Sequence, residues 1–310
     1  MTEKRQILLG ALAVSVSAIF WGFDGIVLTP RLYNLDVAYV VFMLHTIPFL
    51  VMNILLFREY KHIKTFTTSD IIFFGLIALF GGAIGTMAIV KALFLVNFQQ
   101  LTIVVLLQKL QPVFGIILAS ILLKEKIGKN FLIWAALAVT GGYFLTFGLN
   151  LPNIETNKNT IYAALFALLA SFSFGSSTVF SKKILLKFSF KTATFYRYGV
   201  TSLMLLFFVL ISGSISQISE TTRLNWIIFM IIALTTGSGA IFLYYFGLTR
   251  VKANVAAVCE LFFPISAIVF DYIFNDAQLT LVQWISAAVM IFAIVNLNRE
   301  RAKRLDVRKE

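Results

Sequence analysis

The stretch that decides the fold class runs from Ile71 to Phe94 and reads IIFFGLIALFGGAIGTMAIVKALF. Its only charged residue is Lys91. A helix of roughly 20 apolar residues is long enough to cross the hydrocarbon core of a bilayer, which is about 30 Å thick. The stretch therefore predicts a transmembrane helix, and similar apolar runs recur along the whole chain.

The composition of the chain agrees with a membrane protein. Of its 310 residues, 59% are hydrophobic and 13% are charged, whereas a soluble globular chain carries roughly 25% charged residues. So few charges cannot coat a water-facing surface, and the expected surroundings are a lipid bilayer. The formal net charge is +12, but the basic residues are scattered between apolar runs, which argues against a nucleic-acid partner.

Hydropathy along the chain predicts ten transmembrane helices. The first lies near Gln6 to Leu28, and it is expected to be a retained helix because it lacks an Ala-x-Ala-like signal-peptidase site. The other nine are expected at Val37 to Phe57, Ile71 to Phe94, Leu101 to Leu123, Phe131 to Leu149, Thr160 to Ser181, Thr192 to Ser212, Trp226 to Leu248, Asn254 to Phe274 and Thr280 to Val295.

The basic residues predict the orientation of the chain, because Lys and Arg next to a span are retained in the cytosol. One side would hold both termini and the loops around Lys61, Lys126, Lys187 and Lys252, which are rich in basic residues. The only basic residues expected on the opposite side are Arg31, Lys158 and Arg223. We therefore expect a multi-pass protein of the inner (plasma) membrane with both termini in the cytosol.

The two halves of the chain resemble each other at an offset of about 150 residues. The matching pairs are Phe20-Trp21-Gly22 with Ser173-Phe174-Gly175, His45 with Arg197, Pro112 with Pro264, and Trp134 with Trp284. A repeat with an odd number of spans must reverse its orientation in the membrane from one copy to the next. The expected fold is all-α, with two inverted five-helix repeats at residues 1–150 and 159–298 and a basic cytosolic tail at 299–310.

These residues resemble the EamA-type, ten-helix branch of the drug/metabolite transporter superfamily. The resemblance rests on Trp21-Gly22, Phe174-Gly175 and Arg197, and on two similar blocks, 110–126 and 260–276, that each begin near a helix proline. The chain departs from the family's pattern at Lys124, where Gly is common, and at Ala277, where Glu is usual. The resemblance implies a secondary transporter, not an enzyme, with no cofactor; the family includes exporters of amino acids and drugs as well as uptake carriers.

Polar side chains inside the predicted spans are the candidates for substrate binding or coupling, because a charged group there costs roughly 2.5 to 3.5 kcal/mol and usually faces a cavity. These candidates are Asp24, Lys91, Gln108, Lys109, Gln111, Arg197 and Glu260. His45 and Asp271 are more simply interpreted as structural groups. No metal site is expected, since the chain has only two histidines, His45 and His62.

Two of these groups precede prolines that are expected to break their helices. Lys109 should lie roughly 13 Å below the outer surface, with Gln108 and Gln111 beside it and Pro112 following. Glu260 lies four residues before Pro264, whose ring removes the hydrogen bond that the Glu260 carbonyl would accept. Because Glu260 aligns with Gln108 in the repeat, Lys109 and Glu260 are expected to face one cavity. A structural ion pair is the alternative.

The remaining candidates each have a functional and a structural interpretation. Asp24, in the sequence Trp21-Gly22-Phe23-Asp24-Gly25, could bind a substrate amine or pair with Lys91, which is expected at a similar depth. Arg197 lies about five residues into its span, so its side chain could reach the cytosolic surface. Its resemblance to the family's arginine implies a gating or anchoring role.

A cation at Lys109 facing anions at Glu260 and Asp24 suits a zwitterion inserted between them. This favours an amino-acid or related metabolite exporter working by alternating access. The alternatives are an uptake carrier or exchanger for a nucleoside-like, S-adenosylmethionine-like or drug-like metabolite and, more remotely, a membrane enzyme or a channel. Glu260 could instead exchange a proton for the substrate.

Overall fold

The computed structural model describes residues 3–96, 104, 107–150, 158–276 and 278–306. Within these ranges the protein is helical and contains no strand. Nine helices there are long and apolar enough to cross a membrane, and Gln111–Leu122 is a shorter apolar helix. The prediction of an all-α membrane protein is confirmed. The start of the fourth expected span, Leu101 to Leu123, falls partly outside the described residues.

The first half contains five apolar segments in order. They are α1 (Glu3–Phe23), continued by η1 (Asp24–Leu28) and η2 (Thr29–Leu32); α2 (Val37–Leu55); α3 (Thr68–Leu76), continued by η4 (Ile77–Ile84) and α4 (Gly85–Leu95); α6 (Gln111–Leu122); and α7 (Lys129–Phe147). The 3₁₀ segment η3 (Phe57–Thr65) links α2 to α3. The π-helical segments η1 and η4 interrupt their helices near Asp24 and Gly81, and such interruptions are frequent at functional sites.

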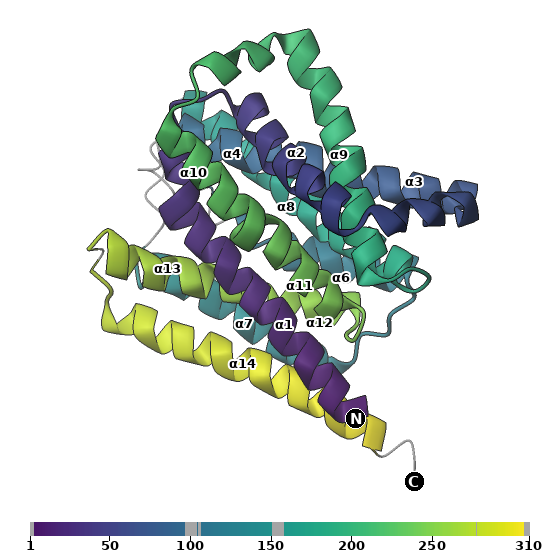
Figure 1. Cartoon of the computed structure of the whole chain (residues 1–310). Coiled ribbons are helices and arrows are strands. Elements are labelled where there is room, and N and C mark those ends of the chain that lie inside the picture. Colours follow the sequence, from purple (N-terminus) through teal and green to yellow (C-terminus); the bar gives the residue numbers. More distant parts are fainter. Residues whose placement is uncertain (1–2, 97–103, 105–106, 151–157, 277, 307–310) are drawn as a thin grey trace.

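The second half repeats this order. It contains α8 (Lys158–Leu185); α9 (Phe190–Ser212), followed by η5 (Ser214–Ser219); α10 (Arg223–Ile232), continued by η6 (Ala233–Gly237) and α11 (Ser238–Leu248); α12 (Ala253–Cys259) with α13 (Phe262–Phe274); and α14 (Leu281–Asp306). The N-terminus of α1 and the C-terminal turns of α14 lie at the same end of the bundle, which we call the termini end (Figure 1).

Corresponding helices of the two halves make corresponding contacts. Helix α1 packs along α11 and α13, and its counterpart α8 packs along α4 and α6. Helix α2 packs against α9, and α7 packs against α14, so each of these helices meets its own counterpart. This pattern is what an inverted pair of five-helix repeats produces around a pseudo-twofold axis.

Two glycines at matching positions permit close contacts between packed helices. A Cβ atom on Gly22 of α1 would lie 2.1 Å from Ser266 Oγ on α13. A Cβ atom on Gly175 of α8 would lie 2.7 Å from the carbonyl oxygen of Gln111 on α6. Gly22 therefore lets α1 approach α13, and Gly175 lets α8 approach α6. Both α13 and α6 have a proline in their first turn, and small residues commonly permit such close helix contacts in membrane proteins.

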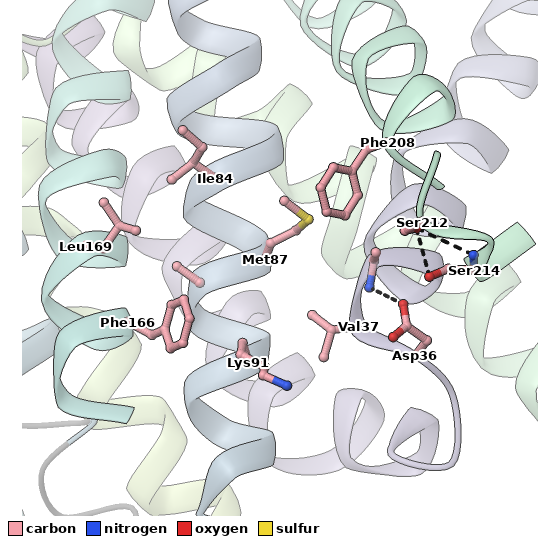
Figure 2. Close-up of a pocket in the computed structure, with 12 residues that line it drawn as sticks. Asp36, Val37, Ile84, Met87, Lys91, Phe166, Leu169, Phe208, Ser212 and Ser214 are labelled. Carbon is pink, nitrogen blue, oxygen red and sulfur yellow. Dashed lines mark hydrogen bonds between the residues drawn. The ribbon is translucent and has the colours of Figure 1, made fainter. Parts of the chain in front are cut away.

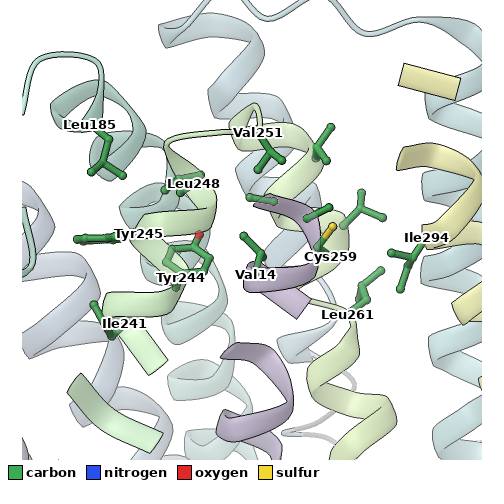
Figure 3. Close-up of a cluster of buried hydrophobic side chains, with 14 of the residues drawn as sticks. Val14, Leu185, Ile241, Tyr244, Tyr245, Leu248, Val251, Cys259, Leu261 and Ile294 are labelled. Atoms are coloured by element: carbon green, nitrogen blue, oxygen red, sulfur yellow. The ribbon is translucent and has the colours of Figure 1, made fainter. Parts of the chain in front are cut away.

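Buried side chains from both halves form the main core. Val14 of α1, Tyr244, Tyr245 and Leu248 of α11, and Cys259 of α12 belong to one cluster (Figure 3). The outward faces of the helices remain apolar and exposed, as at Ile211 of α9, which is 87% exposed. A lipid-facing surface accounts for this exposure, because acyl chains are as apolar as these side chains.

The backbone explains why Gly is common at the position of Lys124, whereas Ala277 lies outside the described residues. Lys124 and Asp276 occupy corresponding positions in the two halves and have positive φ angles of 52° and 54°. Gly is favoured in that conformation because it has no Cβ to clash. After Lys124, the buried carboxylate of Glu125 accepts hydrogen bonds from Ala253 N–H at 2.9 Å and Asn254 N–H at 3.0 Å. Glu125 therefore caps α12 and joins the two halves at the termini end.

Candidate functional site

The ninth span is broken next to Glu260. Helix α12 ends at Cys259 and α13 begins at Phe262, with Pro264 in its first turn. The prediction that Pro264 frees the Glu260 carbonyl is wrong, because that oxygen accepts the Phe263 N–H at 2.9 Å. The backbone satisfies this carbonyl through a tighter i to i+3 turn, so only the carboxylate of Glu260 is available for other partners.

The Glu260 carboxylate lies inside a cage of neutral hydrogen-bond donors. Its Oε1 atom accepts from Tyr244 Oη of α11 at 2.6 Å and from Thr178 Oγ1 of α8 at 3.1 Å. Its Oε2 atom accepts from Gln111 Nε2 at the start of α6. The side chain of Glu260 is only 7% exposed. Because its donors come from α6, α8 and α11, elements from both halves of the chain meet at this carboxylate.

Arg197 of α9 lies in the same interior region and is also buried. Its Nη2 atom donates to the Gly81 carbonyl oxygen at 2.8 Å, and its Nη1 atom donates to Tyr245 Oη at 3.1 Å. The Tyr245 hydroxyl in turn lies 2.7 Å from Ser181 Oγ. The rings of Tyr245, which bonds Arg197, and Tyr244, which bonds Glu260, lie 5.8 Å apart. The alternative in which Arg197 reaches the cytosolic surface is therefore wrong, because its guanidinium is held inside the bundle.

Several buried polar atoms have no hydrogen-bond partner within the described part of the chain. They are Arg197 Nε, Arg250 Nε, Thr236 Oγ1, and the hydroxyls of Ser173, Ser176 and Ser177. Gly81 lets the side chains of Ser177 and Arg197 approach closely, since a Cβ atom there would lie 2.1 Å from Ser177 Oγ and 3.1 Å from Arg197 Nη2. Unsatisfied buried polar groups cost about 1–3 kcal/mol each, so a ligand that satisfies them would bind favourably.

An aromatic pair adjoins the carboxylate. The ring of Trp21, from α1, lies 5.3 Å from the ring of Tyr244, whose hydroxyl holds Glu260. The two ring planes are tilted by 53°, and they place aromatic surface next to a hydrogen-bonding carboxyl group. Such an arrangement suits a ligand with an aromatic part and polar substituents.

Lys109 does not share the Glu260 site, contrary to the expectation from the repeat alignment. Its buried Nζ atom donates to Thr146 Oγ1 on α7, and its carbon chain lies against Gly142. Gln111, only two residues further on, reaches Glu260 instead. Because residues two apart point to different sides of a helix, the side chain of Lys109 extends toward α7. Gln108 is helical and half-buried, directly before the turn that contains Lys109.

Asp24 and Lys91 do not form the ion pair that the sequence allowed. Asp24 is half-buried in η1 and accepts from Thr29 Oγ1 at 3.0 Å. Lys91 is exposed on α4, where it lines a separate cavity. His45 Nδ1 lies 2.8 Å from the Val41 carbonyl oxygen, which favours its structural interpretation. Asp271 accepts from Asn275 Nδ2 at 2.7 Å near the end of α13.

The residues least apparent from the sequence are the neutral donors around Glu260. Tyr244 lies within an apolar run, where a tyrosine is equally common at the membrane interface. Thr178 gives no signal of its own. Within the described part of the chain, no group of three or more His, Cys, Asp or Glu residues could hold a metal ion.

Comparison with known proteins identifies the family. The EamA-like transporter family matches residues 8–147 and again residues 161–299. The chain belongs to the EamA-like transporter family. It is thus a multi-pass membrane transporter, and the resemblance to the EamA-type branch is confirmed.

Two individual proteins resemble this EamA-like transporter over most of its length. The riboflavin transporter ImpX of Fusobacterium nucleatum subsp. nucleatum is 53% identical over 291 residues, which cover 94% of this chain and 97% of that protein. A solved crystal structure matches with a TM-score of 0.68 at 13% identity, covering 95% of this chain and 98% of the other. At that identity the second likeness shows the fold alone.

Proposed function

We propose that this EamA-like transporter carries riboflavin, or a flavin that differs little from it, across the cell membrane by alternating access. The observation that carries the proposal is the 53% identity to a riboflavin transporter over nearly the full length of both chains. The amino-acid cargo expected from the charges receives no support from this relative. Its premise also fails, because Lys109 lies apart from Glu260.

The chemistry of the site suits a flavin. Riboflavin is uncharged at neutral pH and combines a flat ring system, one edge of carbonyl and N–H groups, and a chain of hydroxyls. Trp21 and Tyr244 offer aromatic surface for the rings. Glu260 can accept from an N–H or a hydroxyl, and the unsatisfied Arg197 Nε and serine hydroxyls can bond to carbonyl and hydroxyl oxygens.

A neutral cargo has no charge on which the membrane potential could act. Its accumulation would therefore need a coupled ion, carried by a titratable group of the protein. Glu260 is buried at the break between α12 and α13, where a change of helix packing would alter its surroundings. We therefore keep a proton as the candidate coupling ion, with Glu260 as its carrier. Both termini remain assigned to the cytosol on the basis of the basic loops.

Transport measurements test the proposal directly. The protein should restore growth of a riboflavin-requiring host without riboflavin uptake, and proteoliposomes containing it should take up labelled riboflavin. Excess unlabelled riboflavin should compete, whereas a mixture of amino acids should not. Uptake of labelled amino acids without any uptake of riboflavin would refute the proposed substrate.

A pair of matched variants connects transport to the site. Tyr244→Phe removes a hydroxyl that donates to Glu260, so riboflavin uptake should fall by roughly tenfold, the equivalent of a hydrogen bond to a charged group. Tyr272→Phe changes an exposed tyrosine of α13 and should leave uptake unchanged. If both variants take up riboflavin equally well, the hydrogen bond from Tyr244 to Glu260 has no role in transport.

A further inference from the structure

A cavity lies apart from the Glu260 site, at the end of the bundle opposite the termini. Its volume is about 480 Å³, and it is lined by the first turn of α2, the outer part of α4, and parts of α8 and α9 (Figure 2). Helix α4 packs closely along α8, and α2 along α9. The cavity is the groove left between these two helix pairs.

The polar and apolar residues of the groove are separated along its length. Asp36 precedes α2, Ser212 ends α9, Ser214 begins η5, and Lys91 lies one turn before the end of α4. The rest of the wall is mainly apolar, with Ile84 and Met87 of η4 and α4, Phe166 and Leu169 of α8, and Phe208 of α9. Ile84 is seven residues from Lys91, so the apolar wall extends roughly 10 Å deeper into the membrane.

Lys91 supplies the cation of the groove. The Asp36 carboxylate is occupied at the N-terminus of α2, where it accepts from Ala38 N–H at 2.9 Å and Tyr39 N–H at 3.3 Å. Ser212 and Ser214 bond to each other at 3.0 Å. Lys91 is exposed, and within the described residues no carboxylate lies in ion-pair distance of it. The polar end of the groove thus presents a cation.

The groove opens toward the surface that faces lipid. Leu165 of α8 is 58% exposed, and Phe207 of α9 is 59% exposed, so the helices that form its walls continue into lipid-facing surfaces. An apolar cavity at this position would be filled by acyl chains. A cation close to the end of the hydrocarbon layer attracts the phosphates of lipid headgroups, by about 1 kcal/mol for an anionic lipid.

We infer that this groove binds a phospholipid of the surrounding leaflet, with its phosphate at the Lys91 ammonium and one acyl chain along Ile84, Met87 and Phe166. Anionic lipids are preferred, because the Lys91 ammonium is free to meet a headgroup while the Asp36 carboxylate is held by the backbone of α2. The site is distinct from the transport site. It nevertheless adjoins α9, which carries Arg197, and η4, which carries Gly81.

Native mass spectrometry of the purified full chain tests this inference. The probes are phosphatidylglycerol and phosphatidylcholine with identical acyl chains. The wild type should retain phosphatidylglycerol preferentially, and Lys91→Gln should lower this preference roughly fivefold, the equivalent of about 1 kcal/mol. Lys91→Arg should keep it. Arg31→Gln is the matched control, since Arg31 is an exposed cation at the same end but does not line the groove.

The possible outcomes separate a lipid site from general charge attraction and from a small-anion site. An unchanged preference in Lys91→Gln, or an equal loss in Arg31→Gln, would overturn the inference in favour of general charge attraction. Glycerol phosphate, which carries the phosphate without acyl chains, should not displace the lipid at equal concentration. Displacement by it would overturn the acyl-chain contact and identify a small-anion site. None of these measurements depends on the identity of the transported substrate.

Discussion

Replacing Gly175 by alanine should force α8 and α6 apart. A Cβ atom at this position would lie 2.7 Å from the carbonyl oxygen of Gln111 and 2.9 Å from the backbone nitrogen of Gly115. Both are backbone atoms, so neither can rotate away as the end of a flexible side chain could. The shift must be made by the helices themselves, and it would move the residue that holds Glu260.

The size of the effect follows from two opposing contributions. Overpacking costs about 1–3 kcal/mol, and the backbone clash at Gly175 places it near the upper value. Alanine is favoured over glycine in a helix by about 1 kcal/mol. The expected net destabilisation is about 2 kcal/mol, or roughly a thirtyfold change in the ratio of folded to unfolded protein.

Gly75→Ala provides the control. Gly75 also lies in an apolar helix, α3, but a Cβ atom there would meet nothing within 4 Å. The same substitution should therefore leave stability unchanged or increase it slightly. Heating of the detergent-solubilised variants, followed by size-exclusion chromatography of the remaining folded protein, measures both effects. Gly175→Ala with the stability of Gly75→Ala and with wild-type riboflavin uptake would refute the close contact and its role.

Three further changes test other parts of the structure. Glu125→Ala removes the cap of α12 and should lower the free energy of unfolding by about 1–2 kcal/mol. The control Lys126→Gln changes an exposed neighbour and should leave stability unchanged. Equal melting temperatures of the two variants would contradict the cap. Glu260→Gln should abolish accumulation driven by a pH gradient but spare counterflow exchange if Glu260 carries the proton, and loss of both would make it a substrate ligand. A single cysteine at Lys61, with Cys259 replaced, should resist labelling from outside intact cells, and labelling there would reverse the predicted orientation.

Tertiary structure corrected the candidate site in particular ways. The sequence correctly marked Glu260, Gln111 and Arg197 as polar groups inside spans. It paired Glu260 with Lys109, however, because the repeat alignment compares positions along the chain and ignores the direction of a side chain. Gln111 and Lys109 diverge at the start of α6, and the donors that complete the Glu260 cage come from α8 and α11.

Apolar length and the internal repeat were sufficient to predict an all-helical membrane protein built from two similar halves. That much is local, because each segment in hydrocarbon must satisfy its backbone hydrogen bonds within its own helix, and apolar length alone reveals such a segment. Helix packing, which the sequence does not show, determines which polar groups meet at Glu260 and places Lys91 in a separate groove. Those contacts depend on how each helix is rotated against its neighbours, which is fixed by close packing at small residues such as Gly22 and Gly175.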